Sequence, residues 1–392
     1  MKVNHRIRRL AAALAAMMLM TAGCAEGLPA AGEPALKDMR LDLGGSSVAY
    51  PMLTGMEDQE LQQEINSRIQ ADLDVEAYLS RMTLLMSEEN LRVGVTWAGE
   101  IAGDVLSCVM SAEGALRNNR STHRWTAANI DLRNGQQITL GALFADEAAA
   151  REALAEYLET QVAPEMSAHL NNSELLPLPE TFRLEAAGLT LLYPAEQLST
   201  LSGRAGDIRI GWNEIREYLD MSPEGIPART GAEDMITLTA ESAGKIREMT
   251  EQGCLPGIPA VIGEALKPLT DRYHLLTDPD VYEGGRLFSP EGGCFRDVYL
   301  MTDYLSEDWD DSTVRGIRMD RGCAWGLCIG ETRQEAWREI LGEPEHSVTL
   351  TEEMAEERRR EAGMCDYYRF GEHQLQLYTD AEGTLLSITL TE

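Results

Sequence analysis

The sequence predicts an α+β protein of two domains, each with an antiparallel sheet packed against helices, the second with a weak internal duplication. Three observations predict this class. A length of 392 residues suits two or three domains. Segments of strand length, separated by turn residues, alternate with a few helical segments. Residues 222–234 hold two prolines and two glycines among few large apolar side chains, so we expect a linker between a first domain (41–221) and a second (235–392).

In the first domain, periodicity and turn residues define the elements. Leu61, Ile65, Ile69 and Leu73 recur every four residues behind acidic side chains, so a helix is expected to begin near Asp58. Asn134-Gly135 suits a type I′ turn and predicts a hairpin between 127–132 and 137–140. The remaining expected elements are strands at 48–53, 91–97, 104–110, 182–193 (two) and 208–212, and helices at 146–170 (kinked by Pro164) and 213–219.

The second domain shows the weak duplication. Residues 298–303 (VYLMTD) and 375–380 (LQLYTD) align without gaps, and each copy follows a helical segment and precedes an acidic turn. Two copies are too few for a solenoid, so they indicate one domain formed by duplication. The expected helices are 262–273, 331–341 and 351–361, and the expected strands are 298–302, 312–319, 367–370, 375–378 and 385–390.

The charge balance excludes several classes of protein. The chain has 34 Lys and Arg against 65 Asp and Glu, a formal net charge of −31. Its 44% apolar and 25% charged residues exclude a largely disordered, collagen-like or polytopic membrane protein. Because so acidic a chain repels phosphate backbones, we expect no nucleic-acid partner. The acidity either attracts cationic partners or serves solubility alone.

The N-terminus carries the most specific signal. A basic stretch (2–9) precedes a short apolar run (10–20) and then Thr-Ala-Gly-Cys24. These features predict a signal peptide over 1–23, and the last four residues resemble a bacterial lipobox. The resemblance implies a diacylglycerol on Cys24, a tether over 24–40, and a lipoprotein on the outer face of the cytoplasmic membrane in the bacterial cell envelope. An ordinary secretory signal is the alternative.

The cysteines indicate disulfides. With Cys24 lipidated, six of the seven remain, an even number that suits an oxidising compartment. Cys108 needs a cross-domain partner or remains a thiol, and the spacing fits no zinc motif. The candidates for bridges in the second domain are Cys254, Cys294, Cys323, Cys328 and Cys365, of which Cys323 and Cys328 could close a small loop.

No pattern of catalytic residues is recognisable, so we expect a protein that is not an enzyme and has no cofactor or metal. None of the six histidines lies in a nucleophile motif, and no phosphate-binding glycine loop occurs. Two acidic clusters, at 278–283 and 308–311, do not match a calcium-binding loop and are better explained as solvated loops.

The loop before the expected hairpin is the best candidate for a ligand surface. It carries Arg117, Arg120, His123 and Trp125, which offer charge, a titratable ring and a stacking surface. A solvated loop histidine is the alternative for His123. Of the other tryptophans, Trp309 and Trp325 are surface candidates, and the core candidates are Trp97, Trp212 and Trp337.

Residues 41–221 resemble the extracytoplasmic module of RsiV-type anti-sigma factors and of some peptidoglycan deacetylases. The family's Gly-Gly-Ala-His turn is Gly114-Ala-Leu-Arg117 here, so no ligand contact is implied at that turn. In the sensor branch the module binds lysozyme; because only nine residues precede the apolar run and no deacetylase motif occurs, the resemblance implies binding without signalling or catalysis. The motifs that carry it are Tyr50-Pro51, Ile65-Asn66, the stretch 130–144, Phe182-Arg-Leu, 188–193, 203–210 and 215–219.

Residues 330–392 resemble the repeats of β-lactamase-inhibitor-like and small outer-membrane-assembly lipoproteins, through 330–344, Tyr367-Tyr368 and the final two strands. This resemblance implies a helix on an antiparallel sheet whose exposed face binds protein.

Together these observations favour a non-catalytic binding module for an extracellular protein or cell-wall component, with a cationic protein such as lysozyme as the concrete candidate. A structural or assembly factor that grips another envelope protein through the C-terminal repeats is the second hypothesis. An unrecognised cell-wall hydrolase is the third.

Overall fold

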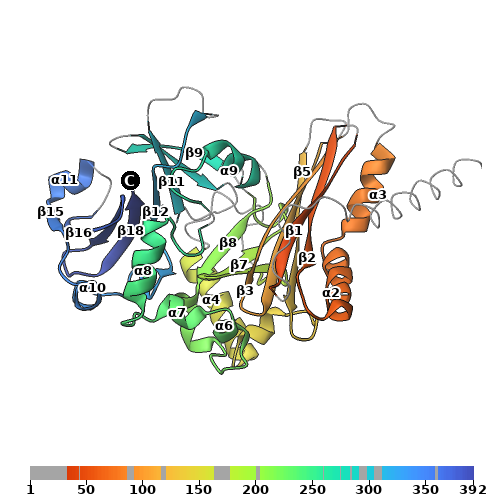
Figure 1. Ribbon diagram of the computed structural model, residues 1–392, viewed down its shortest axis with the longest axis horizontal. Helices are drawn as coiled ribbons and strands as arrows, with labels where there is room; N and C mark the ends of the chain where they lie inside the picture. The colour runs from red at the N-terminus through yellow and green to blue at the C-terminus, as the bar shows by residue number, and fades with distance from the viewer. Residues whose placement is uncertain are drawn as a thin grey trace, which may run out of the picture.

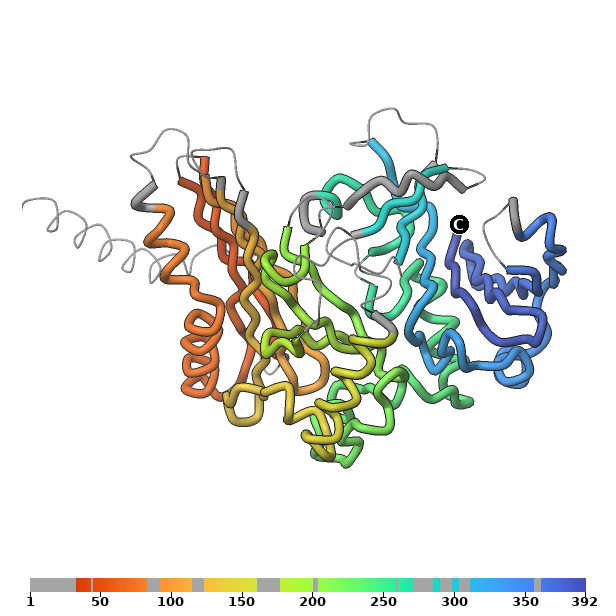
Figure 2. The backbone as a smooth tube through the Cα atoms, turned by 180° about the vertical axis from the view of Figure 1, so that it is seen from behind, coloured from red at the N-terminus to blue at the C-terminus, as the bar shows by residue number. Residues whose placement is uncertain are grey.

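The computed structural model describes residues 33–43, 45–85, 92–115, 121–162, 177–199, 204–258, 260–273, 275–282, 285–290, 298–303, 311–357 and 361–392. It confirms the α+β class. A five-stranded sheet (35–131) and an eight-stranded sheet (275–391) lie at opposite ends of the molecule, with a three-stranded sheet (182–211) between them (Figures 1 and 2). Within these residues no helix combines the length and apolarity needed to cross a membrane. Cys24, Arg117, Arg120, Cys294 and Trp309 lie outside the described residues.

The five-stranded sheet is antiparallel with one exception. Its strands lie in chain order, and only β2 and β3 run parallel, at Ser47 and Val48. Residues expected to belong to a tether over 24–40 are already part of the sheet, because β1 begins at Ala35. The strands are β1 (Ala35–Leu43), β2 (Ser46–Thr54), β3 (Arg92–Ala102), β4 (Val105–Ala115) and β5 (Ser121–Asp131).

Two helices, α2 (Gln59–Asp72) and α3 (Val75–Leu85), cover the outer face of this sheet (Figure 1). The helix start expected near Asp58 is confirmed, since the Asp58 carboxylate accepts the N–H groups of Glu60 and Leu61. Ile65 and Ile69 are fully buried, as their four-residue spacing predicts. The two helices together with Leu73 therefore supply about a third of the buried residues of the first hydrophobic core.

The chain turns at Asn134-Gly135, but only Gly135 has a positive φ, so the turn is not the expected type I′, and the hairpin is shorter than expected. Gly135 has φ 68°, Ile130 pairs with Gln137, and the N–H of Ile138 donates to the carbonyl of Asn129 at 2.7 Å. The chain then leaves β5 and forms a 3₁₀ helix over Leu140–Leu143. Burial decides this outcome, because Leu140 and Leu143 are fully buried in the core of the three-stranded sheet.

The three-stranded sheet packs on the face of the first sheet that the helices leave open. The hydroxyl of Ser107 accepts the N–H of Leu184 at 2.8 Å, and the Asn129 amide donates to the carbonyl of Phe182 at 2.8 Å. The three strands are β6 (Phe182–Glu185), β7 (Gly188–Leu192) and β8 (Asp207–Gly211), flanked by α4 (Glu147–Tyr157), a π-helical segment Leu158–Val162 and a 3₁₀ helix Trp212–Tyr218. Pro164 lies outside the described residues.

Residues 222–234, expected to be a linker, are folded. They contain α6 (Ile226–Arg229) and most of α7 (Ala232–Ile236). Ile226, Ala232 and Ile236 are buried with the core of the three-stranded sheet. A few apolar side chains among prolines and glycines are thus enough to fold this stretch onto the first half of the chain.

The duplication is visible in the topology of the eight-stranded sheet. The strand order is β15-β16-β17-β18-β12-β11-β10-β9, so two four-stranded meanders join through β12 and β18. β11 and β17, which hold the aligned sequences, occupy equivalent places, each next to the last strand of its meander. The first half is α9 (Leu266–Tyr273), β9 (Leu275–Tyr282), β10 (Gly285–Pro290), β11 (Val298–Asp303) and β12 (Gly316–Met319); the second is α10 (Gln334–Leu341), β15 (His346–Leu350), α11 (Glu352–Glu357), β16 (Gly363–Phe370), β17 (His373–Thr379) and β18 (Leu385–Thr391); α8 (Ser242–Glu251) precedes both.

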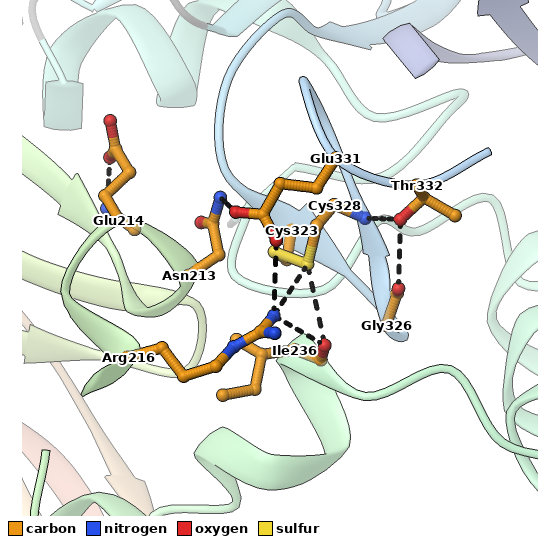
Figure 3. Close-up of a disulfide and its surroundings, with 10 residues drawn as sticks. Asn213, Glu214, Arg216, Ile236, Cys323, Gly326, Cys328, Glu331 and Thr332 are labelled. Carbon is orange, nitrogen blue, oxygen red and sulfur yellow. Dashed lines mark hydrogen bonds and ion pairs between the residues drawn. A yellow bond between two sulfur atoms is a disulfide. The ribbon is translucent and has the colours of Figure 1, made fainter. Parts of the chain in front are cut away.

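A disulfide-closed hairpin connects the two halves of the chain. β13 (Cys323–Ala324) and β14 (Leu327–Cys328) are joined by the Cys323–Cys328 bond, the small loop that their spacing predicts. The N–H of Gly326 donates to the carbonyl of Met235 at 2.8 Å, and both cysteines are buried in the core of the three-stranded sheet. In Figure 3 the Arg216 side chain approaches Cys328 and donates to the carbonyl of Ile236 at 3.1 Å.

Several side chains differ from expectation. Cys254 and Cys365 are thiols in the structure and do not form the bridges considered for them. Cys108 is also a thiol, and burial raises its pKa to about 12, which keeps it protonated. Trp325, expected at the surface, is 2% exposed because it forms the turn of the buried hairpin. Trp97, expected in the core, is only partly buried and donates to Asp38, whereas Trp212 and Trp337 are fully buried as predicted.

Candidate functional site

A cavity of about 500 Å³ lies beside the N-terminal half of β5, the last strand of its sheet. The strand itself contributes His123, Arg124 and Trp125 to the lining. A volume of this size falls within the range of small-molecule sites. The cavity is therefore the first candidate for a binding site.

The walls of the cavity come from both faces of the sheet. Tyr78 belongs to the core under α2 and α3, and Arg81 follows it one turn later on α3. Tyr193 belongs to the core of the three-stranded sheet on the opposite face, and Pro194 follows it. Because Val93 of β3 and residues 112–114 of β4 also line it, the cavity reaches from the edge of β5 over both faces of the sheet.

His123 is held in one tautomer by two neighbours. Its Nδ1 atom accepts the backbone N–H of Ala205 at 3.1 Å, so Nδ1 carries no proton. The proton of the neutral ring is then on Nε2, which lies 2.7 Å from the hydroxyl of Ser111 and donates to it. The side chain is 8% exposed, so it is a positioned ring and not the solvated loop histidine that was the alternative.

Three side chains in the lining, Tyr78, Trp125 and Tyr193, each have a buried polar atom without a hydrogen-bond partner. The indole of Trp125 stands edge-on to His123, with ring centroids 4.5 Å apart, and its Nε1–H is buried without an acceptor. The hydroxyl of Tyr193, just past the end of β7, is also buried without a partner, and burial raises its pKa. Buried polar groups almost always have partners, so each one that does not calls for an explanation. All three lie in the walls of one cavity, where a bound molecule could supply the missing hydrogen bonds.

Charges of both signs surround these rings. Glu113 forms an ion pair with Arg204, and Arg124 lies 3.2 Å from Asp74. Arg81 and Glu196 are exposed at the cavity. The lining therefore offers aromatic surfaces, hydrogen-bonding groups and a balanced set of charges. These are the means of binding a ligand.

The structure places two of the four residues expected at a ligand surface in the same cavity lining. His123 and Trp125 share the cavity, whereas Arg117 and Arg120 lie outside the described residues. Sequence reasoning missed Tyr193, which comes from a different sheet. Its only signal is a hydroxyl-bearing aromatic at the end of an apolar strand, directly before Pro194.

The eight-stranded sheet presents a second surface. On the face opposite its helix-covered core, six side chains form one continuous row across six strands. His346 stacks on Tyr367 with ring centroids 4.3 Å apart, and the Arg318 guanidinium lies 5.3 Å from the centre of the Tyr299 ring. The row is Tyr299, Arg318, Thr389, Gln376, Tyr367 and His346, of which Thr389 is buried and the other five are partly or fully exposed. Over the described ranges, no cluster of three or more His, Cys, Asp or Glu residues could hold a metal ion.

Comparison with known proteins gives fold neighbours only. No protein-family model matches the sequence, and no curated protein matches it. A DUF3298 family member from Bacteroides fragilis is 15% identical, with a TM-score of 0.41 over 52% of this chain and 99% of its own. A DUF3298 protein from Pseudomonas aeruginosa is 14% identical, with a TM-score of 0.34 over 50% and 95%. The DUF4309 protein YjgB from Bacillus subtilis is 14% identical, with a TM-score of 0.27 over 39% and 97%. Likeness of this degree carries no argument about function.

Proposed function

We propose that the protein is a cell-envelope lipoprotein, anchored through Cys24, that binds an extracellular protein or cell-wall component at the cavity beside β5 without catalysis. The observation that carries the proposal is the set of three unpartnered polar groups in the lining of one cavity: the Tyr78 hydroxyl, Trp125 Nε1–H and the Tyr193 hydroxyl. Leaving such groups buried costs about 1–3 kcal/mol each, a cost that a ligand can remove.

A basic protein is the ligand that the charge favours. The chain carries a net charge of −31, which accelerates the approach of cationic partners at low salt. Glu196, exposed at the cavity, gives this attraction a local anchor. Lysozyme is the concrete candidate, as a cationic protein found outside cells.

The test is binding of the purified protein to lysozyme across a salt series. We expect saturable binding that weakens as salt screens the charges. Glu196→Gln should lower the association rate and flatten its salt dependence. Glu335→Gln, an exposed acid on α10 of the other half, is the matched control and should change neither. No binding at low salt, or equal effects of the two variants, contradicts a basic ligand at this site.

A second candidate function is binding of another envelope protein by the eight-stranded sheet. The row of six side chains favours it, because aromatic and arginine side chains are enriched in protein interfaces. Tyr367→Ala should abolish capture of such a partner, while Trp125→Ala should not. The opposite pattern assigns the partner to the cavity beside β5.

A further inference from the structure

The free edge of β5 determines what kind of ligand the cavity can take. At the C-terminal end of this strand, the N–H of Asp131 donates to the carbonyl of Gln136 at 2.9 Å, and the carbonyl of Asn129 accepts from Ile138 at 2.7 Å. Both bonds lie on the edge away from β4. In an antiparallel pair, backbone groups alternate between the two edges of a strand. The odd-numbered residues of β5 therefore direct their N–H and C=O groups away from β4.

Trp125 and Ala127 follow the same alternation. β4 and β5 pair without a register shift from Ser121 to Asp131, so the alternation holds along the whole strand. At these two positions, four backbone groups face the free edge, and the described part of the chain provides no partner for them. An edge with unpaired backbone groups is a template for another strand.

The cavity reaches this edge at Trp125, and Ala127 continues the same edge just outside the cavity lining. A sixth strand would lie about 4.8 Å from β5, in the plane of the sheet. Tyr78 and Arg81 wall that space on the face of α3, and Tyr193 and Pro194 wall it on the face of the three-stranded sheet. Because side chains of a strand alternate between faces, an added strand would contact both walls in turn.

We propose that the cavity is a slot for an extended segment of a protein ligand, which pairs with β5 at Trp125 and Ala127 as a sixth strand of the sheet. The inference rests on the proposed function in that the ligand is a protein; a glycan lacks amide and carbonyl groups at the spacing of a strand. The net charge of −31 favours a basic segment. Main-chain bonds provide the affinity in this mode of recognition, and the side chains that meet the two walls provide the specificity.

The test uses an alternating decapeptide, (Val-Lys)₅, labelled for fluorescence anisotropy, and the protein variants Ala127→Pro and Ala127→Ser. Proline removes the N–H on the free edge without breaking a bond to β4, and edge strands tolerate it. Serine keeps the N–H and is the matched control. We expect Ala127→Pro to weaken binding by about tenfold or more, since it removes one hydrogen bond and adds a steric clash, and Ala127→Ser to bind as the wild type does.

A modified peptide tests the slot with the unaltered protein. It is (Val-Lys)₅ N-methylated at every residue, which keeps the charge but leaves neither edge of the peptide able to donate hydrogen bonds to β5. It should bind at least about tenfold more weakly than unmodified (Val-Lys)₅. Equal binding by the two peptides would mean attraction by charge alone and would overturn the slot, as would equal binding by the two Ala127 variants or no binding of (Val-Lys)₅.

Measuring the binding of lysozyme distinguishes the proposed function from the proposed slot. If lysozyme binds the wild type and Ala127→Pro equally, the proposed function stands and the slot is wrong. If lysozyme does not bind but the peptides show the expected difference, the slot stands and lysozyme is the wrong partner.

Discussion

Arg338 binds Asp366 through two parallel hydrogen bonds, from Nε to Oδ2 at 2.8 Å and from Nη2 to Oδ1 at 2.6 Å. The Asp366 carboxylate is fully buried on β16, and it also accepts from the indole of Trp337 and the hydroxyl of Ser347. This cluster fastens α10 to the second meander of the eight-stranded sheet. A buried carboxylate requires such complete pairing, because an unpaired charge in the core is costly.

Replacing Asp366 should destabilise the protein strongly. We expect Asp366→Asn to lower the free energy of unfolding by about 3 kcal/mol, because it removes the charge that Arg338 and its neighbours were arranged to meet. Chemical denaturation measures the loss. Glu345→Gln is the control: Glu345 and Arg369 are 3.6 Å apart and both about half exposed, so that variant should cost less than about 1 kcal/mol. Similar losses in the two variants would show that burial of the pair is unimportant.

The same carboxylate predicts a pH dependence. Burial opposes the charge of Asp366, but hydrogen bonds from Arg338, Ser347 and Trp337 lower its pKa below the ordinary value of 3.8. When folding lowers the pKa of a group, the group stabilises the protein fully at any pH above its pKa in the unfolded chain. This contribution is lost as the pH falls through its pKa in the folded protein. The stability difference between wild type and Asp366→Asn should therefore be constant near neutral pH and shrink below pH 3.8. A difference that persists unchanged in acid contradicts the assignment.

Gly326 is expected to tolerate no side chain. It has φ 86°, and a Cβ atom there would lie 2.2 Å from the backbone nitrogen of Leu238. Gly326→Ala should cost about 3 kcal/mol or more, combining backbone strain with overpacking. Gly330 has φ 83° but open space around a Cβ, so Gly330→Ala should cost only about 1–2 kcal/mol. Thermal unfolding compares the two; equal costs would mean that the close approach to Leu238 does not matter.

The hydroxyl of Tyr193 predicts a gain of stability on its removal. Because this buried group has no partner, Tyr193→Phe should raise the free energy of unfolding by about 1 kcal/mol. Tyr368 is the matched control, since its buried hydroxyl donates to the carbonyl of Gly342 at 3.1 Å, and Tyr368→Phe should cost about 1 kcal/mol. If Tyr193→Phe is also destabilising, the hydroxyl has a partner in the folded protein, and its role as a ligand contact fails.

Local patterns predicted the elements better than their ends. The spacing of Ile65 and Ile69 and the cap at Asp58 predicted α2, because burial and capping act within a few residues. The second strand predicted for the hairpin, at 137–140, does not form as expected. Leu140 and Leu143 are instead buried in a core that strands distant in the sequence complete. The stretch 222–234 was judged by its prolines and glycines, yet Ile226 and Ile236 hold it in a core. Tertiary burial overrode the local signal in both cases.

Only part of the candidate site could be predicted from the sequence. His123 and Trp125 lie two residues apart on one strand and therefore share a face. Tyr193 and Tyr78 reach the same cavity from a different sheet and from a helix on the opposite face, which no local pattern reports. The free edge of β5 was equally hidden, because the order of strands in a sheet depends on the whole chain.

The hairpin at 323–328 has a consequence for biosynthesis. Its two cysteines complete a core otherwise built from residues 105–236. During synthesis the N-terminal half therefore emerges with that core incomplete, and residues 237–322 must follow before the hairpin can fill it. The first half then completes its core only with a hairpin made much later in the chain, so a chain truncated before Cys323 would lack part of its own N-terminal core.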